Sequence, residues 1–158
     1  MTASPLRRVR VAEVEPVANR IKRFRLVSAD SGAPLSEFSG GSHVTVCMHA
    51  PDRLVRNAYS LMSCPSDPSS YEISVLRVPD SRGGSEFMHD NVRVGSELEI
   101  SEPLNLFPPA KRARKHILVA GGIGITPFMS MMSELDAVGA DFELHYGVRS
   151  LEDGAFCK

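Results

Sequence analysis

The run 117–127 limits the possible folds most, because it joins an apolar strand to a glycine-rich turn and a helix start. Gly121, Gly122 and Gly124 form the turn, and Thr126-Pro127 is typical of a helix N-terminus, with threonine as N-cap and proline in the first turn. Such a turn presents unpaired backbone N–H groups, which favours a bound phosphate or pyrophosphate. The chain ends at residue 158, so we expect one helix and one more strand rather than a complete nucleotide-binding sheet.

Length and charge narrow the class of protein. A chain of 158 residues can form one core, or one domain and a fragment of another. Its net charge of −1 gives no reason to expect nucleic acid or an anionic membrane as a partner. The N-terminus lacks the apolar run of a signal peptide, and no segment has the roughly 20 apolar residues of a membrane helix. We therefore expect a cytoplasmic protein.

The cysteines and histidines do not predict a metal site. Cys47, Cys64 and Cys157 are odd in number and far apart in the sequence, so we expect reduced thiols rather than a disulfide framework. The five histidines show no HExxH motif or paired spacing.

Short strands are predicted as far as about residue 105. Their apolar positions are Val9 and Val11; Ile21, Phe24 and Leu26; Val44, Val46 and Met48; Ile73 and Val75; Leu98 and Ile100. This alternation, broken by turn-rich stretches, predicts a six-stranded antiparallel barrel with one helix after Ser85. We place the domain boundary near the proline-rich and basic stretch 103–114, which gives a barrel over 1–110 and a partial α/β domain over 111–158.

The second domain is predicted to be one parallel strand–helix–strand unit. Residues 117–120 are continuously apolar, as in a strand that is buried on both faces. Phe128, Met131, Met132 and Leu135 have the spacing of one helical face, and Gly139 is suited to end that helix. A second strand follows over 142–147.

Two barrel segments are candidate binding sites. In Asn57-Ala58-Tyr59-Ser60, the tyrosine ring could cover a planar cofactor and the serine hydroxyl could bind its polar edge. Half-buried barrel packing of Tyr59 is the alternative. In Arg82-Gly83-Gly84-Ser85, the glycines allow close backbone approach, Ser85 could cap the next helix, and Arg82 supplies a cation for a phosphate. The alternative is a surface turn, which gives Arg82 no particular role.

The third candidate is the opening glycine run, which differs from the G-x-G-x-x-G dinucleotide fingerprint. A tight strand-to-helix turn is the alternative. Three glycines within four residues argue against it, because they remove side chains where a ligand would approach the backbone.

Taken in order, these segments and Pro103-Leu104-Asn105-Leu106-Phe107 resemble the ferredoxin-NADP reductase-like flavoprotein superfamily. Over residues 8–150 they are most similar to the phthalate dioxygenase reductase and vanillate demethylase reductase group, the electron-transfer components of bacterial oxygenases. The resemblance implies a flavin-binding barrel followed by a nicotinamide-nucleotide domain, with FMN as the flavin and NADH or NADPH as the reductant.

The resemblance also implies site residues. Tyr59 and Ser60, with Asn57 and Ala58 before them, would contact the isoalloxazine and ribityl chain, and Val75, Leu76 and Arg77 would run beside the flavin. Arg82, Gly83, Gly84 and Ser85 would hold the phosphate. The loop 121–126, with Gly121, Gly122, Gly124 and Thr126, would lie near the nicotinamide, and Thr126 would be close to the flavin ring. No catalytic acid or base is implied, because the two cofactors carry the chemistry.

Two features depart from the family pattern. Relatives have arginine two places before the tyrosine, where this chain has Asn57, with Arg56 one residue earlier. The chain also lacks the C-x₄-C-x₂-C spacing of a plant-type iron–sulfur domain. A two-strand parallel fragment leaves apolar faces uncovered, so we expect a separate completing reductase or iron–sulfur subunit, and an oxygenase subunit, in a hetero-oligomer.

The expected function is transfer of electrons from NAD(P)H through FMN to an iron–sulfur or haem partner of a monooxygenase or demethylase acting on small amines or aromatic ethers. The alternative is a non-catalytic assembly or electron-relay subunit without its own NADH site. Asn57 and the short α/β part favour this alternative, whereas the intact run 121–127 argues against it.

Overall fold

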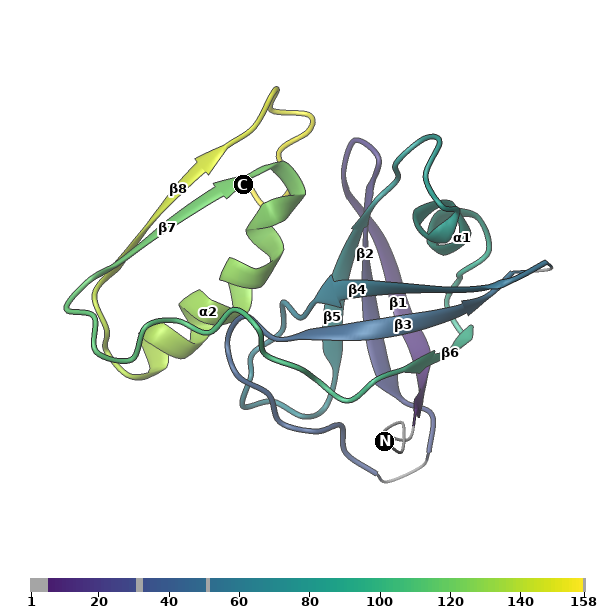
Figure 1. Cartoon of the computed structure of the whole chain (residues 1–158), viewed down its shortest axis with the longest axis horizontal. Coiled ribbons are helices and arrows are strands. Elements are labelled where there is room, and N and C mark those ends of the chain that lie inside the picture. Colours follow the sequence, from purple (N-terminus) through teal and green to yellow (C-terminus); the bar gives the residue numbers. More distant parts are fainter. Residues whose placement is uncertain (1–5, 31–32, 51, 158) are drawn as a thin grey trace.

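The computed structural model describes residues 6–30, 33–50 and 52–157. These residues form two lobes (Figure 1). The larger lobe contains one sheet with the strand order β4-β3-β6-β1-β2-β5, in which all paired neighbours are antiparallel. The strands are β1 (Arg7–Ala18), β2 (Ile21–Ser28), β3 (His43–His49), β4 (Leu54–Ser60), β5 (Tyr71–Leu76) and β6 (Glu97–Ile100). The six-stranded prediction is confirmed.

Alternating side chains build the core of this lobe. Val9, Phe24 and Val44 are fully buried on three different strands, whereas the residues beside them in the sequence are more exposed. Alternation of this kind places one face of each strand inside a closed or curled sheet. The core residues predicted from the periodicity are therefore those that the structure buries.

The sheet curls, but its two edge strands remain unpaired with each other. β4 and β5 approach closely, and the Met62 N–H donates a hydrogen bond of 2.8 Å to the Glu72 carbonyl just beyond one end of β4. The helix α1 (Gly84–Asp90) packs against β3, β4 and β5. A seam thus runs between β4 and β5, and the backbone groups along an unpaired strand edge are available to a ligand.

The smaller lobe is the predicted parallel unit. β7 (His116–Gly121) continues through a short 3₁₀ helix (Gly122–Ile125) into α2 (Thr126–Ala137), and β8 (Phe142–Gly147) pairs with β7 in parallel. Gly139 ends the helix as predicted, because its φ of 66° lies in the left-handed region that glycine tolerates. Among the described residues, no helix has the length and apolar character needed to span a membrane.

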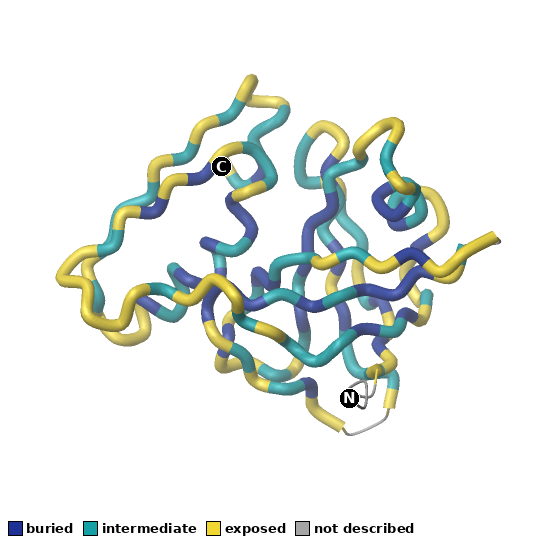
Figure 2. Tube along the Cα trace, in the orientation of Figure 1, coloured by how far each residue is buried: buried dark blue, intermediate teal, exposed yellow. Residues whose placement is uncertain are grey.

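The prediction that β7 is buried on both faces is wrong. Leu118 and Ala120 pack on the α2 side, whereas Ile117 and Val119 are 62% and 70% exposed. Figure 2 shows buried and exposed positions alternating along β7. In the part of the chain that the structure describes, a helix packs on one face of β7 only, so alternate side chains of this apolar strand remain in solvent.

Both predicted helix N-caps are also wrong. Thr126 is the first residue of α2 rather than its N-cap, and its hydroxyl donates a hydrogen bond to the Ile123 carbonyl at 3.1 Å. The reason is that the chain already turns helically from Gly122. Ser85 lies inside α1, where Gly83 takes the N-cap position, and the Ser85 hydroxyl instead accepts the Val78 N–H at 3.1 Å.

A short loop of the barrel fixes α2 in place. The Gly40 N–H donates to the Glu134 carboxylate, and the Gly41 N–H donates to the buried Ser130 hydroxyl at 3.2 Å. The Phe107 ring meets the Phe128 ring edge-on, with 5.8 Å between their centroids. These contacts hold the glycine run at the start of α2 close to β5, which the residues from Gly122 to Ile125 contact.

Candidate functional site

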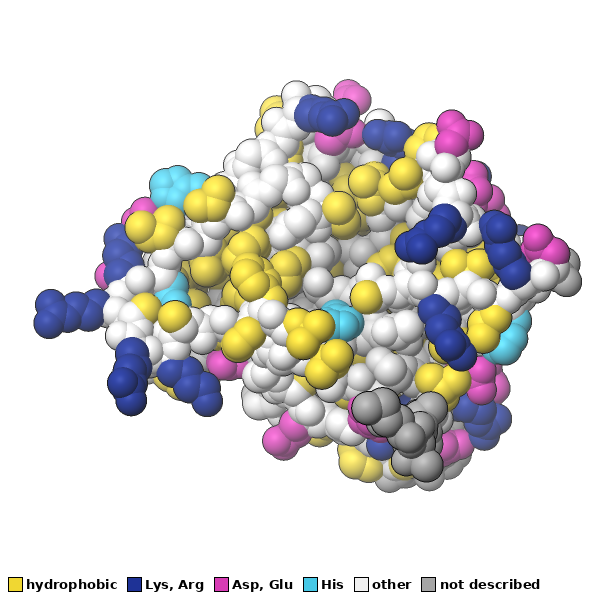
Figure 3. Space-filling view, viewed as in Figure 1, with side chains coloured by type: hydrophobic (Ala, Val, Ile, Leu, Met, Phe, Trp, Pro, Cys, Tyr) yellow, Lys and Arg dark blue, Asp and Glu magenta, His cyan; other side chains and the backbone are white. Residues whose placement is uncertain are grey.

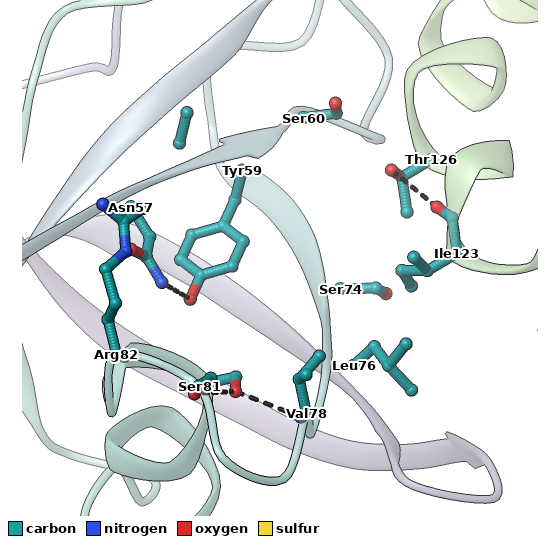
Figure 4. A pocket seen from close by; sticks show the side chains of 13 residues that line it. Asn57, Tyr59, Ser60, Ser74, Leu76, Val78, Ser81, Arg82, Ile123 and Thr126 are labelled. Carbon is teal, nitrogen blue, oxygen red and sulfur yellow. Dashed lines mark hydrogen bonds between the residues drawn. The ribbon is translucent and has the colours of Figure 1, made fainter.

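A cavity of about 380 Å³ occupies the seam between β4 and β5, and we call it the seam cavity. Figure 4 shows side chains from both strands, from the turn before α1 and from the start of α2 around it. Its lining residues are Asn57, Ala58, Tyr59, Ser60, Ser74, Leu76, Val78, Ser81, Arg82, Gly84, Ser85, Ile123 and Thr126. Its size is within the range of small-molecule sites, roughly 300–1,000 Å³.

Tyr59 provides an aromatic face in this cavity. Its hydroxyl accepts a hydrogen bond from the Asn57 side-chain amide at 3.2 Å, which fixes the ring along β4 (Figure 4). Burial raises the pKa of Tyr59, and the Asn57 hydrogen bond lowers it by less, so the phenol stays neutral at pH 7. A neutral, oriented phenol ring can stack on or flank a planar heteroaromatic ligand.

The turn before α1 closes one end of the seam cavity. Gly83 has a φ of 89°, and the Ser81 hydroxyl accepts its N–H at 3.2 Å. At Gly84, a Cβ atom would lie 2.3 Å from the Asn57 Nδ2, so no other residue fits there without moving Asn57. The backbone conformation therefore favours glycine at position 83, and the lack of space favours glycine at position 84.

Three arginines surround a neighbouring cavity of about 210 Å³, the arginine cavity, which shares Asn57 and Arg82 with the seam cavity. Arg53, Arg56 and Arg82 line it, and the Arg53 Nη2 donates to the Arg82 carbonyl at 2.9 Å. Within the described part of the chain, none of the three forms an ion pair with a carboxylate. Three guanidinium groups without an acidic partner favour an anion here.

A third cavity of about 600 Å³, the loop cavity, lies between the β1–β2 turn and the glycine run. Its lining residues are Asn19, Arg20, Ile21, Leu76, Gly121, Gly122, Ile123, Gly147, Val148, Arg149 and Asp153. The space-filling view shows a hollow between the two lobes with apolar side chains near it (Figure 3). Leu76 and Ile123 line both the seam cavity and the loop cavity, so the two are neighbours across these side chains.

The structure brings most of the predicted site residues together. Nine of them line the seam cavity, and Gly121 and Gly122 line the loop cavity. A Cβ atom placed on Gly121, Gly122 or Gly124 would have no atom within 4 Å other than those of residues adjacent in the sequence. The backbone of the glycine run is therefore accessible.

Four predicted residues line neither cavity. Val75 points into the core, and its carbonyl is 2.8 Å from the His89 Nε2. Arg77 pairs with Asp90 on α1, Gly83 caps that helix, and Gly124 lies in the 3₁₀ turn.

Sequence reasoning missed Ser74, Val78 and Ser81 in the seam cavity and Arg53 in the arginine cavity. Ser74 could have been found, because it alternates with the predicted core residues Ile73 and Val75 and so faces the other side of β5. Arg53 gave no such signal, since its contact with Arg82 joins residues 29 positions apart. The described residues contain no group of three or more His, Cys, Asp or Glu side chains that could hold a metal ion.

The chain is similar to known proteins in sequence and in fold. No family model matches the chain. A carnitine monooxygenase reductase subunit from Escherichia coli is 52% identical over 148 residues, which are 94% of this chain and 46% of the relative. A vanillate O-demethylase oxidoreductase from a Pseudomonas species is 46% identical over 146 residues, which are 92% of this chain and 45% of the relative.

The fold comparison agrees. Phthalate dioxygenase reductase, described as a modular structure for electron transfer from pyridine nucleotides to [2Fe-2S], superposes with a TM-score of 0.89 and 41% identity. The match covers 96% of this chain and 46% of that protein, so the chain spans about half the length of these relatives. The resemblance to the ferredoxin-NADP reductase-like superfamily, in the group that includes phthalate dioxygenase reductase and vanillate O-demethylase oxidoreductase, is therefore confirmed for the part of these proteins that the chain spans.

Proposed function

We propose that this chain binds FMN in the seam cavity and forms the flavin-binding part of a cytoplasmic, NAD(P)H-dependent reductase component of a monooxygenase or demethylase. The observation that carries the proposal is the seam cavity itself, which gathers Tyr59, Ser60 and the turn 81–85 between two unpaired strand edges. When bound, the flavin would supply the redox chemistry, taking a hydride from the nicotinamide and passing electrons singly to an iron–sulfur or haem partner.

The cavities suggest which end of the ligand lies where. Arg82 lines both the seam cavity and the arginine cavity, and Gly84 and Ser85 line the seam cavity with it, so a terminal phosphate fits this end. Arg53 and Arg56 lie close enough to line the same space, and they would replace the arginine that relatives have at the position of Asn57. A phosphate that carries two negative charges then meets three cations, which supports FMN over riboflavin.

The loop cavity supports an approach of the nicotinamide nucleotide from the other lobe. The accessible backbone of Gly121 and Gly122 would allow a planar ring to come close, and Arg149 provides a cation for a phosphate. Leu76 and Ile123, which border both cavities, would keep water away from the meeting point of the two rings.

The exposed face of β7 supports the partner that the proposal includes. Ile117 and Val119 are apolar side chains on the uncovered face of a parallel sheet, and such sheets are covered on both faces in stable α/β folds. We propose that a completing reductase or iron–sulfur subunit covers this face, and that an oxygenase subunit accepts the electrons.

Flavin binding tests the proposal directly. The purified chain is titrated with FMN, riboflavin and FAD by fluorescence quenching, and FMN is expected to bind most tightly. Arg53→Ala should weaken FMN about tenfold and leave riboflavin unchanged, since an exposed charged hydrogen bond contributes near the lower end of about 1.5–3 kcal/mol. Arg10→Ala is the matched control, because Arg10 is exposed on β1 and lines none of the three cavities. A chain that takes up no flavin, or that binds riboflavin as tightly as FMN, contradicts the proposal.

Anaerobic addition of NADH or NADPH then tests the electron donor. If NADH or NADPH bleaches the flavin bound to the isolated chain, the chain has a working nucleotide site. If bleaching occurs only after a second subunit is added, the partner completes that nucleotide site. Flavin that neither condition reduces would instead identify a non-catalytic subunit.

A further inference from the structure

Ser74 has a buried hydroxyl without a partner. Its side chain is 5% exposed, and its Oγ is one of two buried side-chain polar atoms in the described residues that form no hydrogen bond. Ser74 lines the seam cavity from the middle of β5, and Figure 4 shows it between Tyr59 and Ile123. A buried hydroxyl without a partner costs free energy, so its retention in a cavity wall needs a reason.

Packing does not supply that reason. The neighbours Ile73 and Val75 point into the barrel core, whereas Ser74 and Leu76 lie on the cavity side. An alanine would satisfy the same strand position without leaving an unpaired polar atom. Ser74 thus brings to the wall of the cavity a hydroxyl that no group of the described residues uses.

Its position within the cavity selects one part of the ligand. Arg82 lies at the end that opens into the arginine cavity, and in Figure 4 it is on the far side of the Tyr59 ring from Ser74. Ser74 shares its end with Ile123 and Thr126. The Thr126 hydroxyl already donates to the Ile123 carbonyl, so it uses its hydrogen within the protein. Ser74 keeps a free donor at the end away from the phosphate.

We propose that the Ser74 hydroxyl donates a hydrogen bond to a nitrogen or carbonyl oxygen on the polar edge of the bound isoalloxazine ring. This inference rests on the proposed flavin site and adds a positioning residue to it. The donor holds the ring end of the ligand, as the arginines hold its phosphate end. Because the reduced ring carries more negative charge on its nitrogen and oxygen acceptors, the same donor favours the reduced form.

In the Ser74→Ala variant, the loss of a flavin contact can be distinguished from a loss of protein stability. The variant should bind FMN and riboflavin about 3- to 10-fold more weakly, by the same factor for both ligands, because a neutral hydrogen bond to the shared ring is lost. It should also lower the midpoint reduction potential of the bound flavin. The apoprotein should unfold at the same or a higher urea concentration than the unsubstituted chain, since no hydrogen bond within the protein is broken.

Ser74→Cys provides a second variant of similar size whose thiol is a weak donor, and it should change affinity and potential in the same direction. Arg53→Ala is the contrast, since its effect should be confined to FMN. Unchanged affinities and potential in both Ser74 variants would overturn the proposal, as would a loss confined to FMN. An unsubstituted chain that binds no flavin would instead reject the flavin site itself.

Discussion

The side-chain amide of Asn57 donates a hydrogen bond to the hydroxyl of Tyr59, two residues further along β4, at 3.2 Å. This pair lies where relatives of the chain have arginine and tyrosine, and the residue at position 57 here orients the aromatic ring in the seam cavity. The hydrogen bond also lowers the pKa of Tyr59 against the larger effect of burial, which raises it.

Asn57→Ala should therefore raise the pKa of Tyr59 further, because the remaining influence is burial. Chemical shifts of the labelled tyrosine ring, followed by NMR from pH 8 to 12, would measure this change. FMN affinity should fall about 3- to 10-fold as the ring loses its restraint, which corresponds to about 0.7–1.4 kcal/mol. A Tyr59 that titrates at the same pH in both proteins would count against the role given to Asn57.

Gly84→Ala should destabilise the chain by about 1–3 kcal/mol, because the added methyl group would lie 2.3 Å from the Asn57 Nδ2 and 3.2 Å from the Met48 Cε. Urea unfolding of the apoprotein measures the change. Gly124→Ala is the matched control: its added methyl meets no atom within 4 Å and its φ is not positive, so stability should hardly change. Equal stability of both variants would show that the turn can relax away from Asn57.

Ser130→Ala should destabilise the chain by about 1–3 kcal/mol, because it leaves the buried Gly41 N–H without its acceptor. Ser130 lies on α2 and outside the three cavities, so flavin affinity measured well below the unfolding transition should stay the same. This is the opposite pattern to that expected for Ser74→Ala. If Ser130→Ala lowered flavin affinity but left the free energy of unfolding unchanged, the structural role given to Ser130 would be wrong.

His89 should make stability depend on pH near neutrality. Burial lowers the pKa of His89 below its ordinary value of 6.5, and its contact with the Val75 carbonyl only partly offsets this. The folded state then binds fewer protons than the unfolded state between the two pKa values, so the stabilisation is present above pH 6.5 and is lost as the pH falls through the folded pKa.

The free energy of unfolding, measured in urea at several pH values from 8 to 5, should fall toward pH 5. In His89→Gln, which keeps a donor for Val75 but does not titrate, the fall should be shallower. Parallel curves for the two proteins would show that other groups cause the dependence.

The local features of this fold could be predicted from the sequence, because alternation and glycine placement act over a few residues. The core positions of β1, β2, β3, β5 and β6, the apolar face of α2 and its end at Gly139 follow from such patterns. Contacts between distant residues could not be predicted. The unpaired seam between β4 and β5 depends on the register of the whole sheet. The contact of Arg53 with Arg82 depends on how the sheet brings together two separate loops, one before β4 and one before α1.

The errors have similar physical causes. Thr126 has the residue type of an N-cap, but the helical turn begins at Gly122, which moves the cap away from it. Ile117 and Val119 have the composition of a doubly buried strand, but burial needs a second layer, which a single strand–helix–strand unit does not provide.

Leu76 and Ile123 each form part of the wall of both the seam cavity and the loop cavity. A substitution at either position therefore alters the surfaces of both cavities together. A change that improves ligand binding in one cavity must also preserve ligand binding in the other. Natural variation among homologues should accordingly be narrower at these two positions than at Val78 or Asp153, which each line only one of the two. The wall that the two cavities share thus limits how independently their specificities can evolve.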